Sequence, residues 1–164
     1  MGLTQSLVVF AIDAQRYALP LAATERVIRV VAVTPLPKAP PIVLGIVDLG
    51  GVVLPVINLR ARFNHPPREL RPSDHLVLAK AGRRSVALLV NDTHGVLEAL
   101  PDSYAPGGEI LPGLEFLAGA LKLQDGLVLI HDLDRLLSLE EETAIDRALG
   151  EPADYRATSE SGGR

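Results

Sequence analysis

The sequence predicts a mainly β fold built from two small five-stranded barrels, with short helices and one C-terminal helix. Three observations predict this class: an internal repeat of strand-like segments, tight-turn residues between apolar runs, and a composition that suits one folded domain. Hydrophobic residues make up 48% and charged residues 22% of the 164 residues, near the averages of globular domains. The chain contains no cysteine, so disulfide bonds play no part in holding the fold.

The repeat is clearest between residues 7–30 and residues 76–99, which align without a gap. Each copy runs as a β-rich stretch, a short polar turn, a second apolar stretch and a third stretch after a polar break, which is the pattern of a three-strand meander. The identical pairs are Leu7/Leu76, Val8/Val77, Ala18/Ala87, Leu19/Leu88, Thr24/Thr93 and Val27/Val96.

A second pair of segments, residues 45–63 and 119–137, extends the repeat. In each, two apolar runs flank a tight turn, at Gly50-Gly51 in the first copy and Asp125-Gly126 in the second, where glycine tolerates positive φ. These segments are predicted hairpins, and Pro55 helps to shape the first of them.

Each hairpin is followed by a predicted short helix. Asn58 and Asp132 occupy equivalent positions in the two copies, and their side-chain oxygens are suited to accept hydrogen bonds from the first backbone N–H groups of a helix. The two halves, roughly residues 7–63 and 76–137, therefore each read as five strands and a short helix. Five short strands close most economically into a barrel, which hides their edges.

The remaining segments are predicted from their turn residues and capping residues. Four prolines make the connection 34–43 stiff and extended, and prolines and glycines in residues 101–117 indicate a surface loop. Ser138 and Glu141 form a capping-box pattern that begins a helix over residues 139–149. Residues 1–150 are thus the expected domain, and residues 151–164 are expected to form a disordered tail.

No motif for catalysis, metal binding or cofactor binding emerges from the chain. There is no nucleophile elbow, phosphate-binding loop or dinucleotide fingerprint, and the four histidines lack metal-ligand spacing. We therefore expect no metal, no cofactor and no enzymatic activity. No apolar run is long enough to span a membrane, so we expect no membrane insertion and a cytoplasmic location.

Several basic residues cluster around the first short helix and form a second possible site. A basic stripe could contact nucleic acid, but the net charge is −4 and aromatic residues make up only 4% of the chain, so stacking platforms are scarce. A solvated surface is the favoured interpretation. The cluster consists of Arg60, Arg62, Arg68 and Arg71.

The motifs of residues 7–137, taken in order, resemble those of the CheW-like coupling domains of bacterial chemotaxis. The stretch GIVDLGGVVLPVINLR (45–60) resembles the central signature of that family, and a proline-rich link precedes it as it does in the family. The opening of the family, an aromatic residue followed by a Tyr-Ala-apolar-Pro run, is present as Phe10, Ile12, Tyr17, Ala18, Leu19 and Pro20.

This resemblance implies a CheW-like fold of two five-stranded β-barrel (SH3/OB-like) subdomains around a shared hydrophobic core. It also implies a non-enzymatic adaptor that couples methyl-accepting receptors to a CheA-type histidine kinase, whose regulatory domain has the same fold. The expected partners are therefore the regulatory domain of such a kinase and a receptor tip, with no nucleic acid.

The sequence departs from the family pattern at two places where family members contact their partners. The family's Asn-Leu-Arg-Gly appears as residues 48–51, so its arginine is Gly50 here, and the family's Val-x-Glu-Ile appears as residues 24–27, with Arg26 in place of the glutamate. Both changes alter the charge that is offered to a partner. The residues expected to form the protein-binding site are Thr24, Arg26, Val27, Gly45, Asp48, Leu49, Gly50 and Gly51.

Three alternatives stay open at this point. The chain could be a divergent relative that binds the kinase without ordinary receptor coupling, because of Gly50 and Arg26. A pair of small barrels could instead bind nucleic acid through the basic cluster. An enzyme is the third alternative, and it would require a deep pocket that holds two titratable groups.

Overall fold

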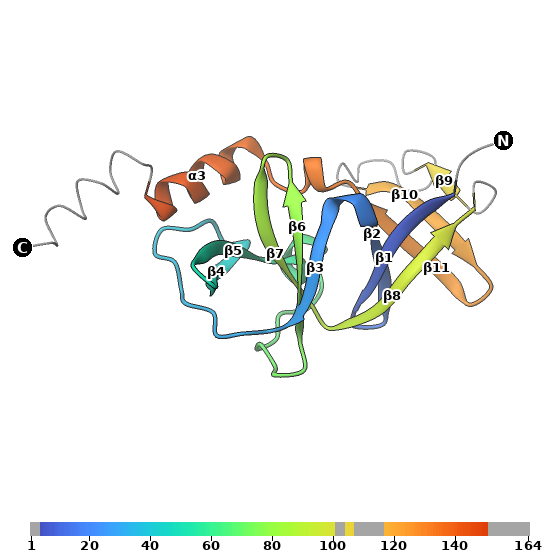
Figure 1. Cartoon of the computed structure of the whole chain (residues 1–164), viewed down its shortest axis with the longest axis horizontal. Helices are drawn as coiled ribbons and strands as arrows, with labels where there is room; N and C mark the ends of the chain where they lie inside the picture. Colours follow the sequence, from blue (N-terminus) through green and yellow to red (C-terminus); the bar gives the residue numbers. More distant parts are fainter. Residues whose placement is uncertain (1–3, 101–103, 107–116, 151–164) are drawn as a thin grey trace, which may run out of the picture.

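A computed structural model of the chain describes residues 4–100, 104–106 and 117–150, and these form two sheets placed side by side along an elongated molecule (Figure 1). One sheet has six strands in the order β8-β1-β2-β11-β10-β9, and the other has five in the order β3-β6-β7-β5-β4. The strands are β1 (Gln5–Ile12), β2 (Gln15–Pro20), β3 (Thr24–Arg29), β4 (Val43–Leu49), β5 (Val52–Asn58), β6 (His75–Ala81), β7 (Arg84–Val90), β8 (Asp92–Ala99), β9 (Tyr104–Pro106), β10 (Leu117–Leu123) and β11 (Gly126–His131).

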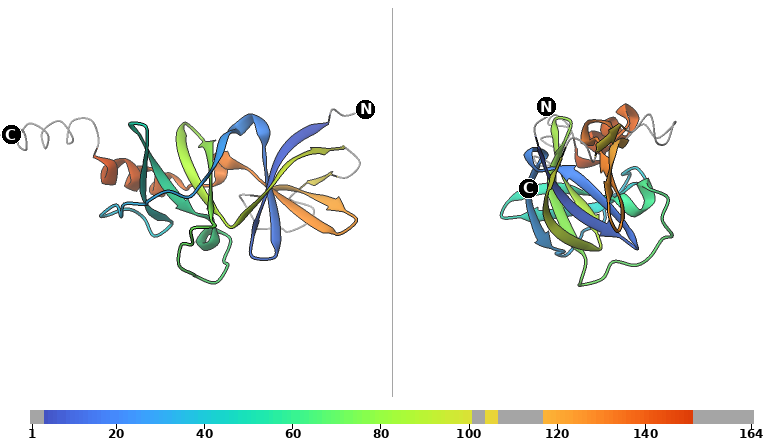
Figure 2. Two further views of the ribbon diagram at one scale, coloured as in Figure 1. Left: turned by 60° about the horizontal axis from the view of Figure 1, so that its bottom comes forward. Right: turned by 90° about the vertical axis from the view of Figure 1, so that its right-hand side faces the viewer.

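The two predicted copies are present, each with three strands, a connection, a hairpin and a short helix, so the mainly β fold class is confirmed. The copies exchange strands, however. The β6–β7 pair of the second half lies between β3 and β5 of the first half, and the β1–β2 pair of the first half lies between β8 and β11 of the second. The halves 7–63 and 76–137 therefore describe the repeat in the sequence, whereas each sheet combines strands from both (Figure 2).

The sheets are rolled, but the pairings of the described strands do not close either one into a ring, which corrects the expectation of barrels without edges. In the five-stranded sheet the edges are β3 and β4. The chain that follows β3 reaches β4 through a single bridge between Thr34 and Ile46. The prolines after Thr34 have no N–H group to continue a ladder, and this explains why the sheet stays open.

Three apolar clusters hold the molecule together. The largest lies between the two sheets and combines Phe10 and Leu19 from the six-stranded sheet with Val77 and Leu88 from the five-stranded sheet. A smaller cluster fills the inside of each rolled sheet, around Leu7 in one and around Leu76 in the other. The shared core that the family resemblance implies is thus observed, flanked by one inner core in each sheet.

The short helices begin where the capping residues predict. Helix α1 (Leu59–Arg62) starts after Asn58, whose side chain accepts a hydrogen bond from the Ala61 N–H, and η3 (Leu133–Arg135) starts after Asp132, which accepts from the Asp134 N–H. A further single turn, η1 (Leu21–Ala23), joins β2 to β3.

Helix α3 (Leu139–Leu149) coincides with the predicted C-terminal helix, and both bonds of its capping box are formed. It lies at the end of the molecule that the five-stranded sheet occupies (Figure 1), and Ile145 anchors it in the shared core. The predicted tail, residues 151–164, lies outside the described residues.

Two local predictions need correction. The turn of the second hairpin occupies residues 124–125, one residue earlier than predicted, and Gly126 begins β11 with φ of 137°. The connection 101–117, expected to be a loop throughout, contains the short strand β9, which pairs with β10. Residues 101–103 and 107–116 lie outside the described part of the chain.

Candidate functional site

The two stretches predicted to contact partners meet at one groove on the five-stranded sheet. Residues 24–27 begin β3 and residues 48–51 end β4, and side chains from both line a groove with a volume of about 310 Å³. The full lining is Glu25, Arg26, Leu49, Val52, Leu54, Leu78 and Ser85. All five strands of the sheet therefore contribute to it.

The groove is the open end of the rolled sheet. Successive residues of a strand face opposite sides, so Val52, Leu54 and Val56 on β5 share a face, and Leu54 and Val56 belong to the inner core of this sheet. Leu54 and Leu78, with exposed fractions of 7% and 5%, form the floor of the groove. Val52, at the rim, is 58% exposed.

A β-bulge brings two neighbouring residues of β3 to the same groove. The register with β6 shifts between the pairs Thr24/Ala79 and Arg26/Leu78, so Glu25 is the extra residue. A bulge of this kind interrupts the alternation of side chains. Glu25 and Arg26 therefore both line the groove, although an undisturbed strand would place them on opposite faces.

The turn between β4 and β5 gives the groove a well-defined wall. Gly50 and Gly51 have φ values of 65° and 92°, a pair of positive values that suits a two-residue hairpin turn. Asp48 Oδ1 accepts a hydrogen bond from the Gly51 N–H at 2.7 Å. Asp48 and the two glycines thus position Leu49 and Val52 on either side of the turn.

The other residues of the predicted site serve the fold or lie on a different surface. The Thr24 hydroxyl donates to the Pro20 carbonyl at 3.2 Å, and exposed Val27 lies one residue beyond Arg26, on the opposite face of β3. A Cβ atom on Gly45 would lie 2.2 Å from the Thr34 carbonyl oxygen, so glycine is needed there for the bridge to β4. Pro55 is buried opposite Ile46 in the β4–β5 ladder.

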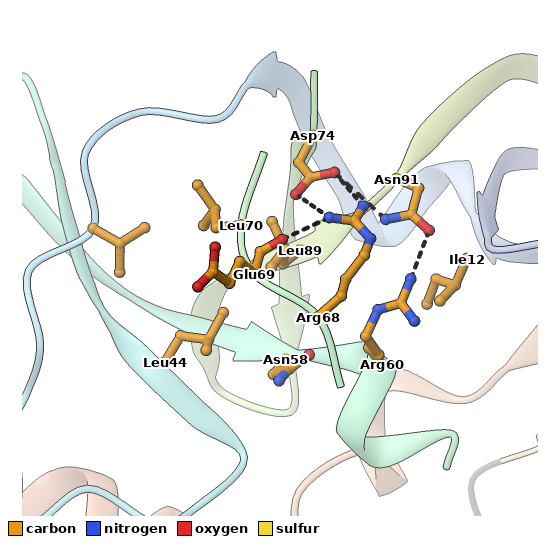
Figure 3. Close-up of a pocket in the computed structure, with 11 residues that line it drawn as sticks. Ile12, Leu44, Asn58, Arg60, Arg68, Glu69, Leu70, Asp74, Leu89 and Asn91 are labelled. Carbon is orange, nitrogen blue, oxygen red and sulfur yellow. Dashed lines mark hydrogen bonds and ion pairs between the residues drawn. The ribbon is translucent and has the colours of Figure 1, made fainter. Parts of the chain in front are cut away.

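A second cavity, of about 290 Å³, lies at the junction of the two sheets, and Arg68 and Asp74 in its lining form an ion pair (Figure 3). Arg60 is 7% exposed and bonds both carboxylate oxygens of Asp13, at 2.9 and 2.5 Å. Arg68 bonds both oxygens of Asp74, at 3.3 and 2.6 Å. Asn91 links the two pairs, since it accepts from Arg60 and donates to Asp74. We call Asp13, Arg60, Arg68, Asp74 and Asn91 the junction cluster.

The junction cluster shifts the pKa values of its carboxyl groups. The hydrogen bond from Arg60 lowers the pKa of Asp13, and His65 adds to this effect. Burial alone would raise the pKa of Asp74, but hydrogen bonds from Arg68 and from the Arg71 N–H outweigh it, so the pKa lies below its ordinary value. Both carboxylates are therefore held in their charged form.

The expectation of a solvated basic surface around α1 was wrong. Arg60 and Arg68 pair within the junction cluster, and Arg62 pairs with Glu141 of α3. Only Arg71 of the four lacks an ion pair among the described residues. Arg60 and Arg62 pair with carboxylates far away in the sequence, and Arg68 pairs with a carboxylate later in the same loop. Residue spacing around α1 therefore does not predict these pairs.

One chain of hydrogen bonds near the junction has the order of a catalytic triad but not its chemistry. Tyr17 Oη lies 2.6 Å from His65 Nε2, and His65 Nδ1 lies 3.2 Å from Asp13 Oδ2. Burial raises the pKa of Tyr17 to about 12, so its phenol stays neutral at physiological pH and is a poor nucleophile. The arrangement fixes the loop after α1 to the β1–β2 turn.

Residues 4–100, 104–106 and 117–150 contain neither a candidate metal site nor a candidate membrane-spanning helix. No group of three or more His, Asp or Glu side chains is placed to hold a metal ion there. No helix in those ranges has both the length and the apolar character needed to cross a bilayer.

Comparison with known proteins agrees with the geometry. The family model described as "CheW-like domain" matches residues 6–141. A probable chemotaxis protein CheW of Rhizobium etli is 28% identical over 142 residues, which cover 85% of this chain and 92% of that protein. The chemotaxis protein CheW of Rhizobium meliloti is 27% identical, with the same coverage of both chains.

A solved structure supports the fold. The scaffolding protein TtCheW of Thermoanaerobacter tengcongensis superposes with a TM-score of 0.77 at 24% identity, covering 85% of this chain and 96% of that one. The fold of two rolled sheets around a shared core agrees with this structure. The family model covers most of the chain, and the chain therefore belongs to the CheW-like domain family.

Proposed function

We propose that this protein is a cytoplasmic adaptor that couples a CheA-type histidine kinase to methyl-accepting chemotaxis receptors by protein–protein contacts, without catalysing a reaction. The observation that carries this proposal is the groove, because it joins the two signature stretches, residues 24–27 and 48–51, into one surface. Its apolar floor and exposed apolar rim suit a protein side chain.

The test of kinase coupling is co-elution with the purified regulatory domain of the kinase encoded in the same genome. We expect one complex peak on a sizing column at tens of micromolar of each protein, a concentration typical of weak signalling contacts. Separate peaks for the two proteins at that concentration would count against kinase coupling.

A second candidate, a relative that binds the kinase but not the receptor, is favoured by two specific residues. Gly50 and Arg26 stand where the family resemblance gives arginine and glutamate; Arg26 lines the groove, and Gly50 lies in the turn between Leu49 and Val52, which line it. Co-elution with a receptor signalling tip separates the candidates, since the first predicts binding to kinase and receptor and the second predicts binding to the kinase alone.

The variant Gly50→Arg tests whether the glycine at this position prevents receptor binding. A Cβ atom at Gly50 meets nothing within 4 Å, so the added side chain has room, although its φ of 65° carries a strain of about 1 kcal/mol. Gly50→Asn is the control, because asparagine tolerates this φ and adds no charge. Receptor binding gained by Gly50→Arg and not by Gly50→Asn would assign the defect to the missing arginine.

The nucleic-acid alternative loses its support, because three of the four arginines behind it are paired with carboxylates of the same chain. A filter-binding assay with single-stranded DNA checks it. A protein that binds through free cations would show a steep loss of affinity with salt, and we expect no such binding.

A further inference from the structure

We propose that the groove of the five-stranded sheet recognises a carboxylate side chain of a partner protein, held between Arg26 and Lys80 and flanked by apolar side chains. The inference rests on the proposed function, because it assigns a chemistry to the partner segment that the adaptor would bind. It is specific to this chain, since it depends on where two unpaired cations lie.

Lys80 lies on β6 next to the groove. Leu76, Leu78 and Lys80 alternate along β6 and therefore share a face, and Leu76 and Leu78 belong to the inner core of this sheet. Lys80 lies directly opposite Ser85, which lines the groove. Side chains of directly opposed residues are about 5 Å apart at their Cβ atoms, so the exposed lysine extends the same rim.

Arg26 and Lys80 lie close enough to contact the same carboxylate. Arg26 is paired with Leu78, and Lys80 lies two residues further along β6. The two cations are thus close to diagonal neighbours on adjacent strands, and such positions are about 7 Å apart. One carboxylate fits between two cations at this spacing and can interact with both.

Neither cation, Arg26 or Lys80, has an ionic partner within the described part of the chain. Glu25 lines the same groove but is not within ion-pair distance of either cation. The rim therefore offers two unpaired positive charges against one negative charge, whereas the whole chain carries a net charge of −4.

The apolar side chains of the groove favour a protein segment as the partner. The groove floor consists of Leu54 and Leu78, and Leu49 and Val52 complete its apolar side. An apolar floor of this size suits a leucine or similar side chain next to the carboxylate, whereas a phosphate backbone would leave it unfilled. The positive charge of this rim would also favour an acidic partner over a basic one.

A peptide titration tests the chemistry of the groove without any natural partner. The probe is the blocked tripeptide acetyl-Leu-Glu-Leu-amide, added to the ¹⁵N-labelled full chain at up to about 10 mM, a range that detects millimolar affinity. We expect shifts of the amide signals of Arg26, Leu49 and Ser85. The matched probe, acetyl-Leu-Gln-Leu-amide, should cause shifts at least about five times smaller at equal concentration.

Three outcomes of this titration would overturn the inference. They are no shifts with the glutamate peptide, equal shifts with both peptides, or shifts confined to the six-stranded sheet. A single-stranded oligothymidylate that shifted the same amides at equal concentration would instead assign the groove to nucleic acid.

Charge-reversal variants test whether the proposed partners bind at the groove. Arg26→Glu should weaken binding of the receptor tip or of the kinase regulatory domain, whichever occupies the groove, by about tenfold or more. The matched control is Arg29→Glu, because Arg29 lies on the same strand, is exposed and faces away from the groove. Arg26→Gln should give an intermediate loss, and Lys80→Glu a loss in the same direction.

The two proposals can fail separately. Equal effects of Arg26→Glu and Arg29→Glu on a binding partner would overturn the groove chemistry while leaving the adaptor function standing. If wild-type protein bound neither the kinase domain nor the receptor tip, the adaptor function would fail, and the peptide titration would still decide whether the groove accepts a carboxylate.

Discussion

Two charged regions of this protein use the same residue types in opposite ways. In the junction cluster, Arg60 and Arg68 are each bonded to a carboxylate, and Asp74 is 1% exposed. At the groove, Arg26 and Lys80 are exposed and have no ion pair among the described residues. Charges that are buried and saturated hold the two sheets together, whereas exposed and unsaturated charges are available to a partner.

The two regions differ in how much folding stability is lost when a charged neighbour is removed. A buried ion without its partner is strongly destabilising, because it is cut off from water. An exposed cation on a strand edge is hydrated, so changing it costs the fold very little. The two regions should therefore separate cleanly in measurements of stability and of binding.

The largest effect is expected for Asp74→Ala in the junction cluster. The substitution removes the acceptor of Arg68, Asn91 and the Arg71 N–H and leaves a partly buried guanidinium unpaired. We expect a loss of about 3 kcal/mol in the free energy of unfolding, measured by urea denaturation. Asp48→Ala, a carboxylate that bonds only the Gly51 N–H, is the control and should lose less than about 1 kcal/mol.

A pair of glycine substitutions compares the bridge near the junction with the turn at the groove. Gly45→Ala should cost about 2 to 3 kcal/mol, because its Cβ atom would collide with the Thr34 carbonyl and force the two chains apart. Gly51→Ala has a φ of 92° but nothing within 4 Å of its Cβ atom, so about 1 kcal/mol is expected. Equal losses in the two unfolding curves would contradict the steric explanation.

Acid should weaken the ion pairs that Asp74 forms with Arg68 and Glu141 forms with Arg62. The folded-state pKa values of Asp74 and Glu141 lie below their ordinary values of 3.8 and 4.5. Their contribution to stability is therefore complete above these ordinary values, and it is lost as the pH falls through the lower folded-state values. Urea denaturation between pH 7 and pH 3 should show this loss. In Asp74→Asn the acid-induced loss should be smaller, and an unchanged pH profile would contradict the assignment.

The smallest effect on stability is expected at the groove itself. Arg26→Glu should change the free energy of unfolding by less than about 0.5 kcal/mol, because the side chain is exposed and unpaired. Thermal melting followed by circular dichroism checks this. A loss as large as that of Asp74→Ala would mean that Arg26 belongs to the structural framework, and the contrast between the regions would fail.

Local features of this fold could be predicted from the sequence, and long-range ones could not. The hairpin at Gly50-Gly51, the caps at Asn58 and Asp132 and the capping box at Ser138 depend on residues within a few positions of one another. The exchange of the β1–β2 and β6–β7 pairs between the two halves depends on pairings across the whole chain, which a pattern of alternation does not specify.

The candidate site shows the same division. The family resemblance singled out Arg26, Leu49 and the turn glycines; Arg26 and Leu49 line one groove, and the glycines form the turn beside it. Lys80 and Ser85 were missed, because they carry no motif and reach the rim only through the register of β6 with β7. The partners of Arg60 were missed for a similar reason, since Asp13 lies 47 positions away in the chain.

The most direct test of the account is amide hydrogen exchange of this protein with and without the kinase regulatory domain and the receptor tip. If the groove is the contact surface, exchange should slow at residues 24–27 and 48–54 and remain unchanged in the loop 63–74 beside the junction cluster. Slowed exchange confined to that loop or to the six-stranded sheet, with residues 24–27 and 48–54 unaffected, would contradict the account.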